Sequence, residues 1–141
     1  MTNFSSVKFC IGPMSKNIVD TIIKFVNDNS VKMILIPSRR QVEMDGGYVN
    51  NWKTKELCEY VRSRTNNIYI ERDHGGPGQG TLDDDGLESF KEDSKYLDII
   101  HIDPWKKYHK YEDGLEKTIE LINYCYKLNN HLYFEVATEE A

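Results

Sequence analysis

An aspartate and a histidine stand side by side at Asp73-His74, directly in front of the glycine- and proline-rich turn 75–78. The short apolar segment 67–70 precedes them and is typical of a buried strand. In α/β proteins, catalytic and binding groups usually follow the ends of strands. A carboxylate beside an imidazole supplies a proton carrier and a metal ligand in one place. The alternative is a hydrogen-bonded turn with no chemical role, and the pair alone favours neither.

Five apolar segments rich in β-branched and aromatic residues recur along the chain, at 7–11, 31–36, 67–70, 97–102 and 132–136. Each ends in polar or turn residues, so we expect buried parallel strands. The alternation of these segments with helical patterns predicts an α/β fold built from a parallel (β/α) repeat. Four βα units and a fifth strand amount to about the first half of a TIM-barrel-like (β/α)8 barrel. The prediction is one partial domain over residues 1–141, and an open five-stranded parallel sheet is the alternative.

The segments between the strands carry apolar residues at the three- and four-residue spacing of helices. Ser15 and Thr54 are expected to cap the first two helices. The longest apolar stripe runs through Leu115, Ile119, Ile122 and Tyr126. Because no helix follows the last strand before Ala141, we expect either a longer chain or completion by a partner.

Strand alternation places polar side chains on one face of three strands. We expect the following residues to face the same side: Glu71 and Asp73; His101 and Asp103; Glu135 and, if the strand continues, Glu139. Each buried charge without a partner lowers the stability of the fold by roughly several kcal/mol. Such a cluster of acids therefore requires a bound cation or pairing with basic side chains.

Two arrangements satisfy that requirement. A divalent metal could bind to His74, Asp103 and Glu139, which offer suitable nitrogen and oxygen ligands. Alternatively, the acids could form an internal salt-bridge layer with nearby arginines, namely Arg39, Arg40 and Arg72.

Candidate substrate contacts follow the second strand. Ser38, Arg39 and Arg40 end that strand, and two arginines can hold a phosphate bidentately or neutralise nearby acids. Gly47 belongs to a Gly-Gly pair in a loop of about 15 residues, long enough to suggest function.

Charge and composition exclude several classes of protein. The net charge of −5 offers no basic field for nucleic acid or an anionic membrane. No segment approaches the roughly 20 apolar residues of a membrane span, and the N-terminal residues do not resemble a signal peptide. Three widely spaced cysteines indicate no disulfide framework. We therefore expect a cytoplasmic protein.

Four motifs in register resemble a known family: Gln41-Val42 with Gly46-Gly47-Tyr48, Asp73-His74-x-Gly76-Pro77, His101-x-Asp103, and Thr138-Glu139. Together they resemble the non-catalytic subunit of class II D-tagatose-1,6-bisphosphate aldolase, a TIM barrel related to zinc-dependent class II aldolases. The resemblance implies that His74 is a zinc ligand, that Asp73 transfers protons, and that Asp103 and Glu139 lie near the metal. It also implies that a separate catalytic subunit performs the cleavage.

Three functions follow as hypotheses. The first is an accessory subunit of a class II tagatose-bisphosphate aldolase in carbohydrate metabolism. The second is an active divalent-metal-dependent aldolase acting on a phosphorylated sugar, with His74 on the metal and Asp73 as acid/base. The third is a non-enzymatic half-barrel that assembles with itself, as a homo-oligomer, or with another chain.

Overall fold

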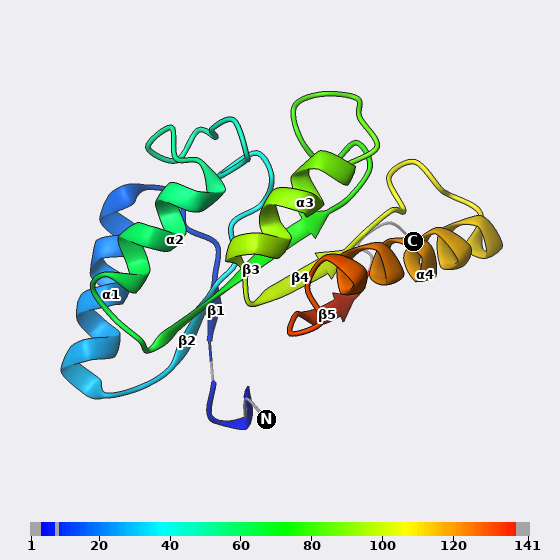
Figure 1. Cartoon of the computed structure of the whole chain (residues 1–141). Helices are drawn as coiled ribbons and strands as arrows, with labels where there is room; N and C mark the ends of the chain where they lie inside the picture. The colour runs from blue at the N-terminus through cyan, green and yellow to red at the C-terminus, as the bar shows by residue number, and fades with distance from the viewer. Residues whose placement is uncertain (1–3, 8, 138–141) are drawn as a thin grey trace.

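Five parallel strands alternate with four helices in the computed structural model, which describes residues 4–7 and 9–137 (Figure 1). The elements are β1 (Cys10–Ile11), α1 (Lys16–Asn29), β2 (Met33–Leu35), α2 (Thr54–Arg62), β3 (Ile68–Gly75), α3 (Leu87–Tyr96), β4 (Ile99–Ile102), α4 (Tyr111–Leu128) and β5 (Tyr133–Val136). A 3-10 turn at Phe4–Ser6 precedes them. This confirms the predicted parallel (β/α) repeat.

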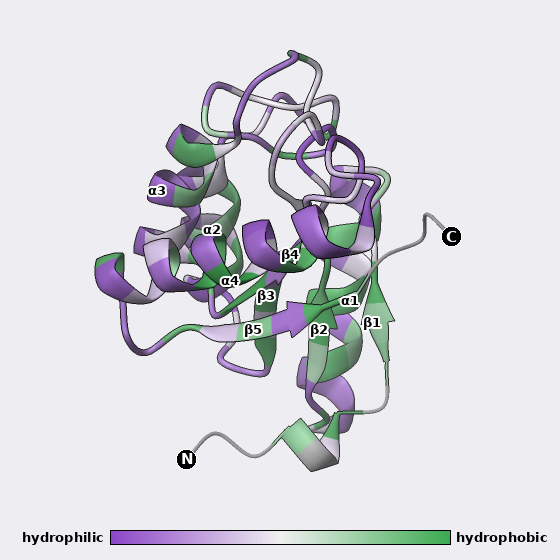
Figure 2. Ribbon diagram, turned by 90° about the vertical axis from the view of Figure 1, so that its right-hand side faces the viewer, coloured by the Kyte–Doolittle hydropathy of each residue, from purple (hydrophilic) through white to green (hydrophobic). Residues whose placement is uncertain are grey.

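The strands lie in the sheet in the order of the sequence, β1-β2-β3-β4-β5, and every neighbouring pair is parallel. Because βα crossovers are right-handed, a sheet wound in one direction receives all its helices on one face. The helices accordingly lie together on one side of the strands (Figures 1 and 2). The result is half-barrel-like, and the carboxyl ends of all strands meet at one edge.

Two apolar clusters fill the space between sheet and helices. One joins α1, α2, β2 and β3 around Leu35, Leu57 and Ile70. The other joins α3, α4, β4 and β5 around Phe90 and Ile100. Each fully buried side chain of this size contributes about 1.5–3 kcal/mol, so the helix-covered face holds the fold together.

Local chemistry fixes the helix starts, with one difference from expectation. Ser15 caps α1 as predicted, since its hydroxyl accepts a hydrogen bond from the Ile18 N–H. Thr54 is the first residue of α2 and not its cap, which is Lys53. The Thr54 hydroxyl instead donates to Asp93 of α3. Asp93 forms a buried ion pair with Arg72, and this pair requires a further polar partner.

Most of the long apolar stripe of α4 faces away from the sheet. Leu115, Ile119 and Tyr126 are exposed, whereas Ile122 packs partly against the core. The buried face of α4 consists of Gly114, Thr118, Leu121 and Cys125. A Cβ on Gly114 would lie 2.1 Å from the Trp105 ring, so the glycine permits this close approach. Periodicity thus predicted the helix correctly but not the face that it buries.

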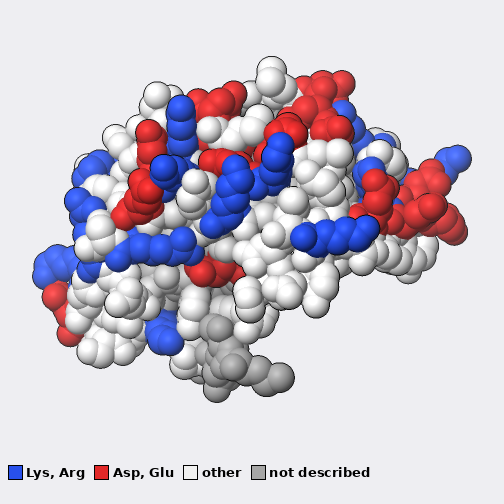
Figure 3. Space-filling view, in the orientation of Figure 1, with Lys and Arg blue, Asp and Glu red and all other residues white. Residues whose placement is uncertain are grey.

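The three cysteines are all free thiols. Cys10 is exposed, and burial raises the pKa of Cys58 and of Cys125 to about 12. Among the described residues, none of the helices combines the length and hydropathy that a membrane span requires. Basic and acidic side chains are interspersed on the face shown in Figure 3.

Candidate functional site

A break in the register of β3 creates the site. Arg72 pairs with Ile100, and Gly75 pairs with Ile102. Between these two pairs β3 advances by three residues and β4 by two, so β3 contains one extra residue. The extra residue forms a β-bulge, in which His74 has a left-handed backbone with φ +47°. In a regular strand, Asp73 and His74 would point to opposite faces. The bulge turns both towards the concave face of the sheet, which the helices leave open.

Asp73, His74 and His101 lie together at this edge, with one ligand atom from each within 4.8 Å of the others. Asp73 Oδ1 is 3.7 Å from His74 Nε2 and 3.7 Å from His101 Nδ1. Ligands of a tetrahedral zinc ion stand about 3.3 Å apart, given metal–ligand bonds of about 2.0–2.1 Å. Small side-chain movements would therefore let the three residues bind one divalent metal.

The outer nitrogens of both imidazoles have hydrogen-bond acceptors. His74 Nδ1 lies 2.7 Å from Asp103 Oδ2, and His101 Nε2 lies 3.1 Å from the Ala137 carbonyl oxygen. In the neutral rings, these contacts place the protons on the outer nitrogens. His74 Nε2 and His101 Nδ1 are then the ring nitrogens on the side of Asp73, which is how metal-binding histidines are usually oriented, although His101 Nδ1 also accepts the His74 backbone N–H at 3.3 Å.

Negative surroundings favour a cation at this position. Burial by itself lowers the pKa of His101, but the Asp73 carboxylate and the hydrogen bond to the Ala137 carbonyl, with nearby acids, raise it to about 9. Burial also lowers the pKa of His74, and Asp103 and Asp73 more than reverse this effect. The same acids that hold a proton on each ring would hold a divalent metal in its place.

A cavity of about 220 Å³ opens beside the cluster on the concave face. Its walls include Cys10, Glu71 and Glu135, as strand alternation predicts for the two acids. Burial and the neighbouring Glu135 carboxyl raise the pKa of Glu71 well above its ordinary value. The Glu71 carboxyl in the wall of the cavity therefore keeps its proton to a higher pH than an ordinary glutamate does.

The predicted metal ligands are only partly brought together. Asp103 has a side chain that is 6% exposed, and it lies behind His74, accepting hydrogen bonds from that ring and from Gln79 Nε2. This position orients His74 and does not face the cluster. Asp73, predicted as a catalytic residue, lies within the cluster together with His101. Glu139 is outside the described residues.

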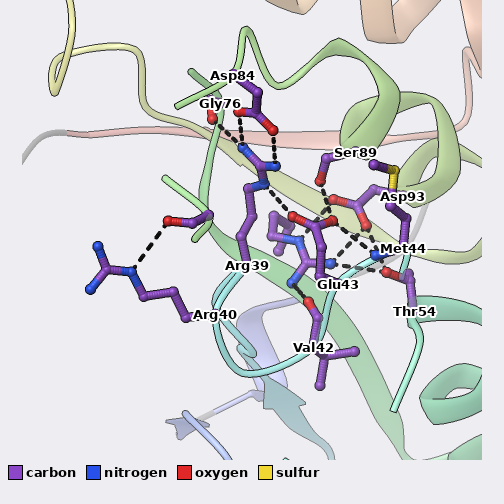
Figure 4. A network of polar contacts seen from close by, with 12 residues as sticks. Arg39, Arg40, Val42, Glu43, Met44, Thr54, Gly76, Asp84, Ser89 and Asp93 are labelled. Atoms are coloured by element: carbon purple, nitrogen blue, oxygen red, sulfur yellow. Dashed lines mark hydrogen bonds and ion pairs between the residues drawn. The ribbon is translucent and has the colours of Figure 1, made fainter. Parts of the chain in front are cut away.

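The buried arginines pair with acids other than those of the strand-end cluster. Arg39 is 3% exposed and donates to Glu43, to both Asp84 oxygens and to the Gly76 carbonyl (Figure 4). The sequence left two roles open for Arg39, phosphate binding and neutralisation of acids. Its guanidinium pairs with Glu43 and Asp84, so it has the second role and is not positioned to bind a substrate. Arg72 pairs with Asp93 in the interior.

The other predicted substrate residues have separate positions. The Ser38 N–H donates to Gln41 Oε1 at 2.8 Å, and Ser38 forms a β-bridge with Asp73. Gly47 packs against the backbone at Gln41, where a Cβ would come within 2.2 Å of the carbonyl oxygen. Arg40 is exposed and extends away from the Arg39 network (Figure 4).

Two contributors had no signal in the sequence. Gln79 reaches Asp103 from the turn after β3, and Asp93 reaches Arg72 from α3 across 21 positions. Neither belongs to a motif, and both act through contacts that arise only on folding. Strand alternation predicts His101 as a neighbour of the other polar residues but not as a metal ligand.

No family model matches this chain, and a comparison with curated proteins finds no match. A solved structure described as a probable tagatose 6 phosphate kinase from Sinorhizobium meliloti has a similar fold, with a TM-score of 0.71 over 94% of this chain. The two are 13% identical, and this chain spans 38% of the length of that one. At that identity the likeness establishes the α/β fold alone, and the resemblance to the aldolase subunit family stays a prediction.

Proposed function

We propose that this chain is a metal-binding, aldolase-like protein of carbohydrate metabolism that serves as the accessory subunit of a class II tagatose-bisphosphate aldolase. The observation that carries the proposal is the cluster of Asp73, His74 and His101 at the carboxyl edge of a parallel sheet. Two of the four family-like motifs supply this cluster and the Asp103 behind it. The similar solved structure is described as a probable tagatose 6 phosphate kinase, which supports phosphorylated sugars as the ligand class.

Zinc is the first candidate for the metal, because two imidazoles and one carboxylate suit it. His74 Nε2, His101 Nδ1 and an Asp73 oxygen would hold the ion. Three protein ligands would leave a position open for a substrate oxygen, where a divalent metal, when bound, would supply Lewis-acid polarisation of a carbonyl. Asp103 would keep the His74 ring in its ligand orientation through the 2.7 Å hydrogen bond.

The position of Asp73 favours the accessory role over independent catalysis. A carboxylate that lies between two imidazoles and binds the metal is no longer free to carry protons. The apolar stripe of Leu115, Ile119 and Tyr126 on α4 is exposed, which favours association with another chain.

An active metal-dependent aldolase is the second candidate, and the exposure of Asp73 favours it. The Asp73 side chain is 32% exposed at the edge of the open cavity, whereas that of Asp103 is 6% exposed. If His74 and His101 bind the metal alone, Asp73 is free to move a substrate hydroxyl proton as a general acid/base.

Zinc titration of the purified chain tests the metal site. We expect one zinc per chain, with affinity lost in His74→Ala and in His101→Ala. Asp103→Asn should weaken zinc binding about 10–100-fold, as expected for a residue that orients a ligand. His131→Ala is the matched control, because His131 is exposed and outside the cluster. Failure of the wild-type chain to bind zinc, manganese or cobalt at micromolar concentration would remove the basis of the proposal.

Activity assays separate the two candidates. The accessory role predicts negligible aldol cleavage by the chain alone and a several-fold gain when a class II tagatose-bisphosphate aldolase catalytic subunit is added. Metal-dependent cleavage by the chain alone, lost in Asp73→Asn with metal still bound, would instead establish the second candidate. Native mass measurement of the mixture detects the expected complex or a homo-oligomer.

A further inference from the structure

A second cavity, of about 300 Å³, lies among the loops that follow β2, β3 and β4. Arg40 comes from the first loop, Gly78 and residues 80–83 from the second, and Lys106 with Lys107 from the third. These loops follow the same edge of the sheet (Figure 1) at which Asp73, His74 and His101 lie. The cavity is therefore within reach of ligands that approach that edge.

The cavity carries an excess of positive charge. Lys107 Nζ is 2.6 Å from Asp83 Oδ1 and donates to the Asp84 carbonyl, so these charges offset each other. The Asp84 carboxylate is occupied by Arg39. Neither Arg40 nor Lys106 has an ion pair among the residues that the structure describes, which leaves two cationic groups without counter-charges.

Arg40 is held in place without being neutralised. Its Nε donates to the Gly80 carbonyl oxygen at 3.4 Å, a long contact that uses one of five guanidinium donors (Figure 4). No partner for its terminal nitrogens occurs within residues 4–7 and 9–137. A planar guanidinium with both terminal nitrogens available matches the oxygens of a phosphate bidentately.

The turn after β3 supplies backbone donors to the same cavity. Gly78 has φ +70°, and a Cβ on Gly80 would lie 3.0 Å from Arg39, so both positions favour glycine. Across the described part of the chain, the N–H groups of Gly80, Thr81 and Leu82 have no hydrogen-bond acceptor. Free backbone N–H groups in a glycine-rich turn, beside cationic side chains, are typical of anion sites.

We propose that Arg40, Lys106 and the backbone of residues 80–82 bind the phosphate group of a phosphate monoester. Gln79, next to these donors, hydrogen-bonds Asp103 Oδ2 at 2.9 Å, the same oxygen that contacts His74. The proposed anion site and the cluster of Asp73, His74 and His101 are thus connected through two side chains, Gln79 and Asp103. The assignment of the monoester as a sugar phosphate rests on the proposed function, whereas the anion site itself does not.

Calorimetric titration with inorganic phosphate, D-fructose 6-phosphate and D-fructose tests the site. We expect both phosphates to bind, D-fructose to bind at least tenfold more weakly, and affinity to fall as salt is raised. Arg40→Gln and Lys106→Gln should each weaken phosphate binding about tenfold or more. Arg62→Gln is the matched control, an exposed arginine on α2 outside this cavity. Tighter binding of the sugar phosphate than of inorganic phosphate identifies a phosphorylated substrate, and equal binding identifies the phosphate group alone as the ligand.

Unchanged phosphate affinity in both Arg40→Gln and Lys106→Gln, with the fold retained by circular dichroism, would overturn the proposal. So would equal affinity for D-fructose and its phosphate. Zinc binding measured in the same variants separates this outcome from failure of the proposed function. Arg40→Gln should keep zinc and lose phosphate, whereas His74→Ala should lose zinc and keep inorganic phosphate.

Discussion

Replacement of Arg72 by methionine should be among the most destabilising single changes in this chain. Arg72 and Asp93 are both 0% exposed. The guanidinium uses all five of its donors, two on Asp93 at 2.8 Å and the others on the Pro37 carbonyl, the Val42 carbonyl and the Thr54 hydroxyl. It joins the end of β2, the start of α2 and the middle of α3 directly behind the bulge of β3.

The expected cost follows from what methionine leaves behind. It fills much of the volume but leaves the Asp93 carboxylate buried, with the Thr54 hydroxyl as its remaining described partner. Removing one member of a buried ion pair costs about 3–5 kcal/mol. Domains of this size are stable by roughly 5–15 kcal/mol. The variant should therefore lose roughly a fifth or more of a typical stability, with Tm lower by about 6–20 °C.

Urea unfolding followed by circular dichroism gives the free energy of unfolding directly. Arg62→Met is the matched control, because Arg62 pairs with Asp98 at 3.1 Å on the surface and should cost at most about 1 kcal/mol. The double variant Arg72→Met/Asp93→Leu should recover much of the loss, since it leaves no unpaired buried charge. Similar costs for Arg72→Met and Arg62→Met would refute the reasoning, as would a double variant less stable than Arg72→Met alone.

Three further outcomes follow from the packing and charges. Gly47→Ala should lower the free energy of unfolding by about 1–3 kcal/mol through overpacking, because its Cβ would collide with the Gln41 carbonyl. Gly12→Ala is the control and should cost less in the same unfolding assay, because the nearest atom to a Cβ at Gly12 is 3.7 Å away. A thiol reagent at about pH 8 should modify Cys10 in the folded protein, and the two buried cysteines only on unfolding. Mass spectrometry counts the modified thiols, and modification of all three before unfolding would contradict the burial. The Arg39 guanidinium holds the pKa of Asp84 below its ordinary value, so Asp84 stabilises the fold above about pH 4 and less as the pH falls through its lower folded pKa. The loss of stability in Asp84→Asn should thus be larger at about pH 7 than at about pH 2.5, and equal losses would count against the pair.

The sequence by itself determined the order of the elements. Periods of 2 and of 3.6 in the apolar residues reflect which backbone groups and faces must be buried, and that information is local. It therefore predicted five parallel strands, four intervening helices and the strand-end position of Asp73 and His74. Alternation along β4 also placed His101 and Asp103 on the same side of the sheet, which the structure confirms for His101 by its contact with Asp73.

Only the tertiary structure decided which groups meet. The bulge with its left-handed His74 backbone arises from pairing between β3 and β4, and it alone turns Asp73 and His74 to one face. Asp84 pairs with Arg39 from 45 positions away and Asp93 pairs with Arg72 from 21 positions away, so no local pattern predicts these two ion pairs. The face that α4 buries likewise depends on tertiary fit, with Gly114 against Trp105 and Leu121 in the core, more than on its apolar stripe. Contacts of this kind depend on shape and charge across the folded chain, whereas periodicity records only that a side chain must be covered.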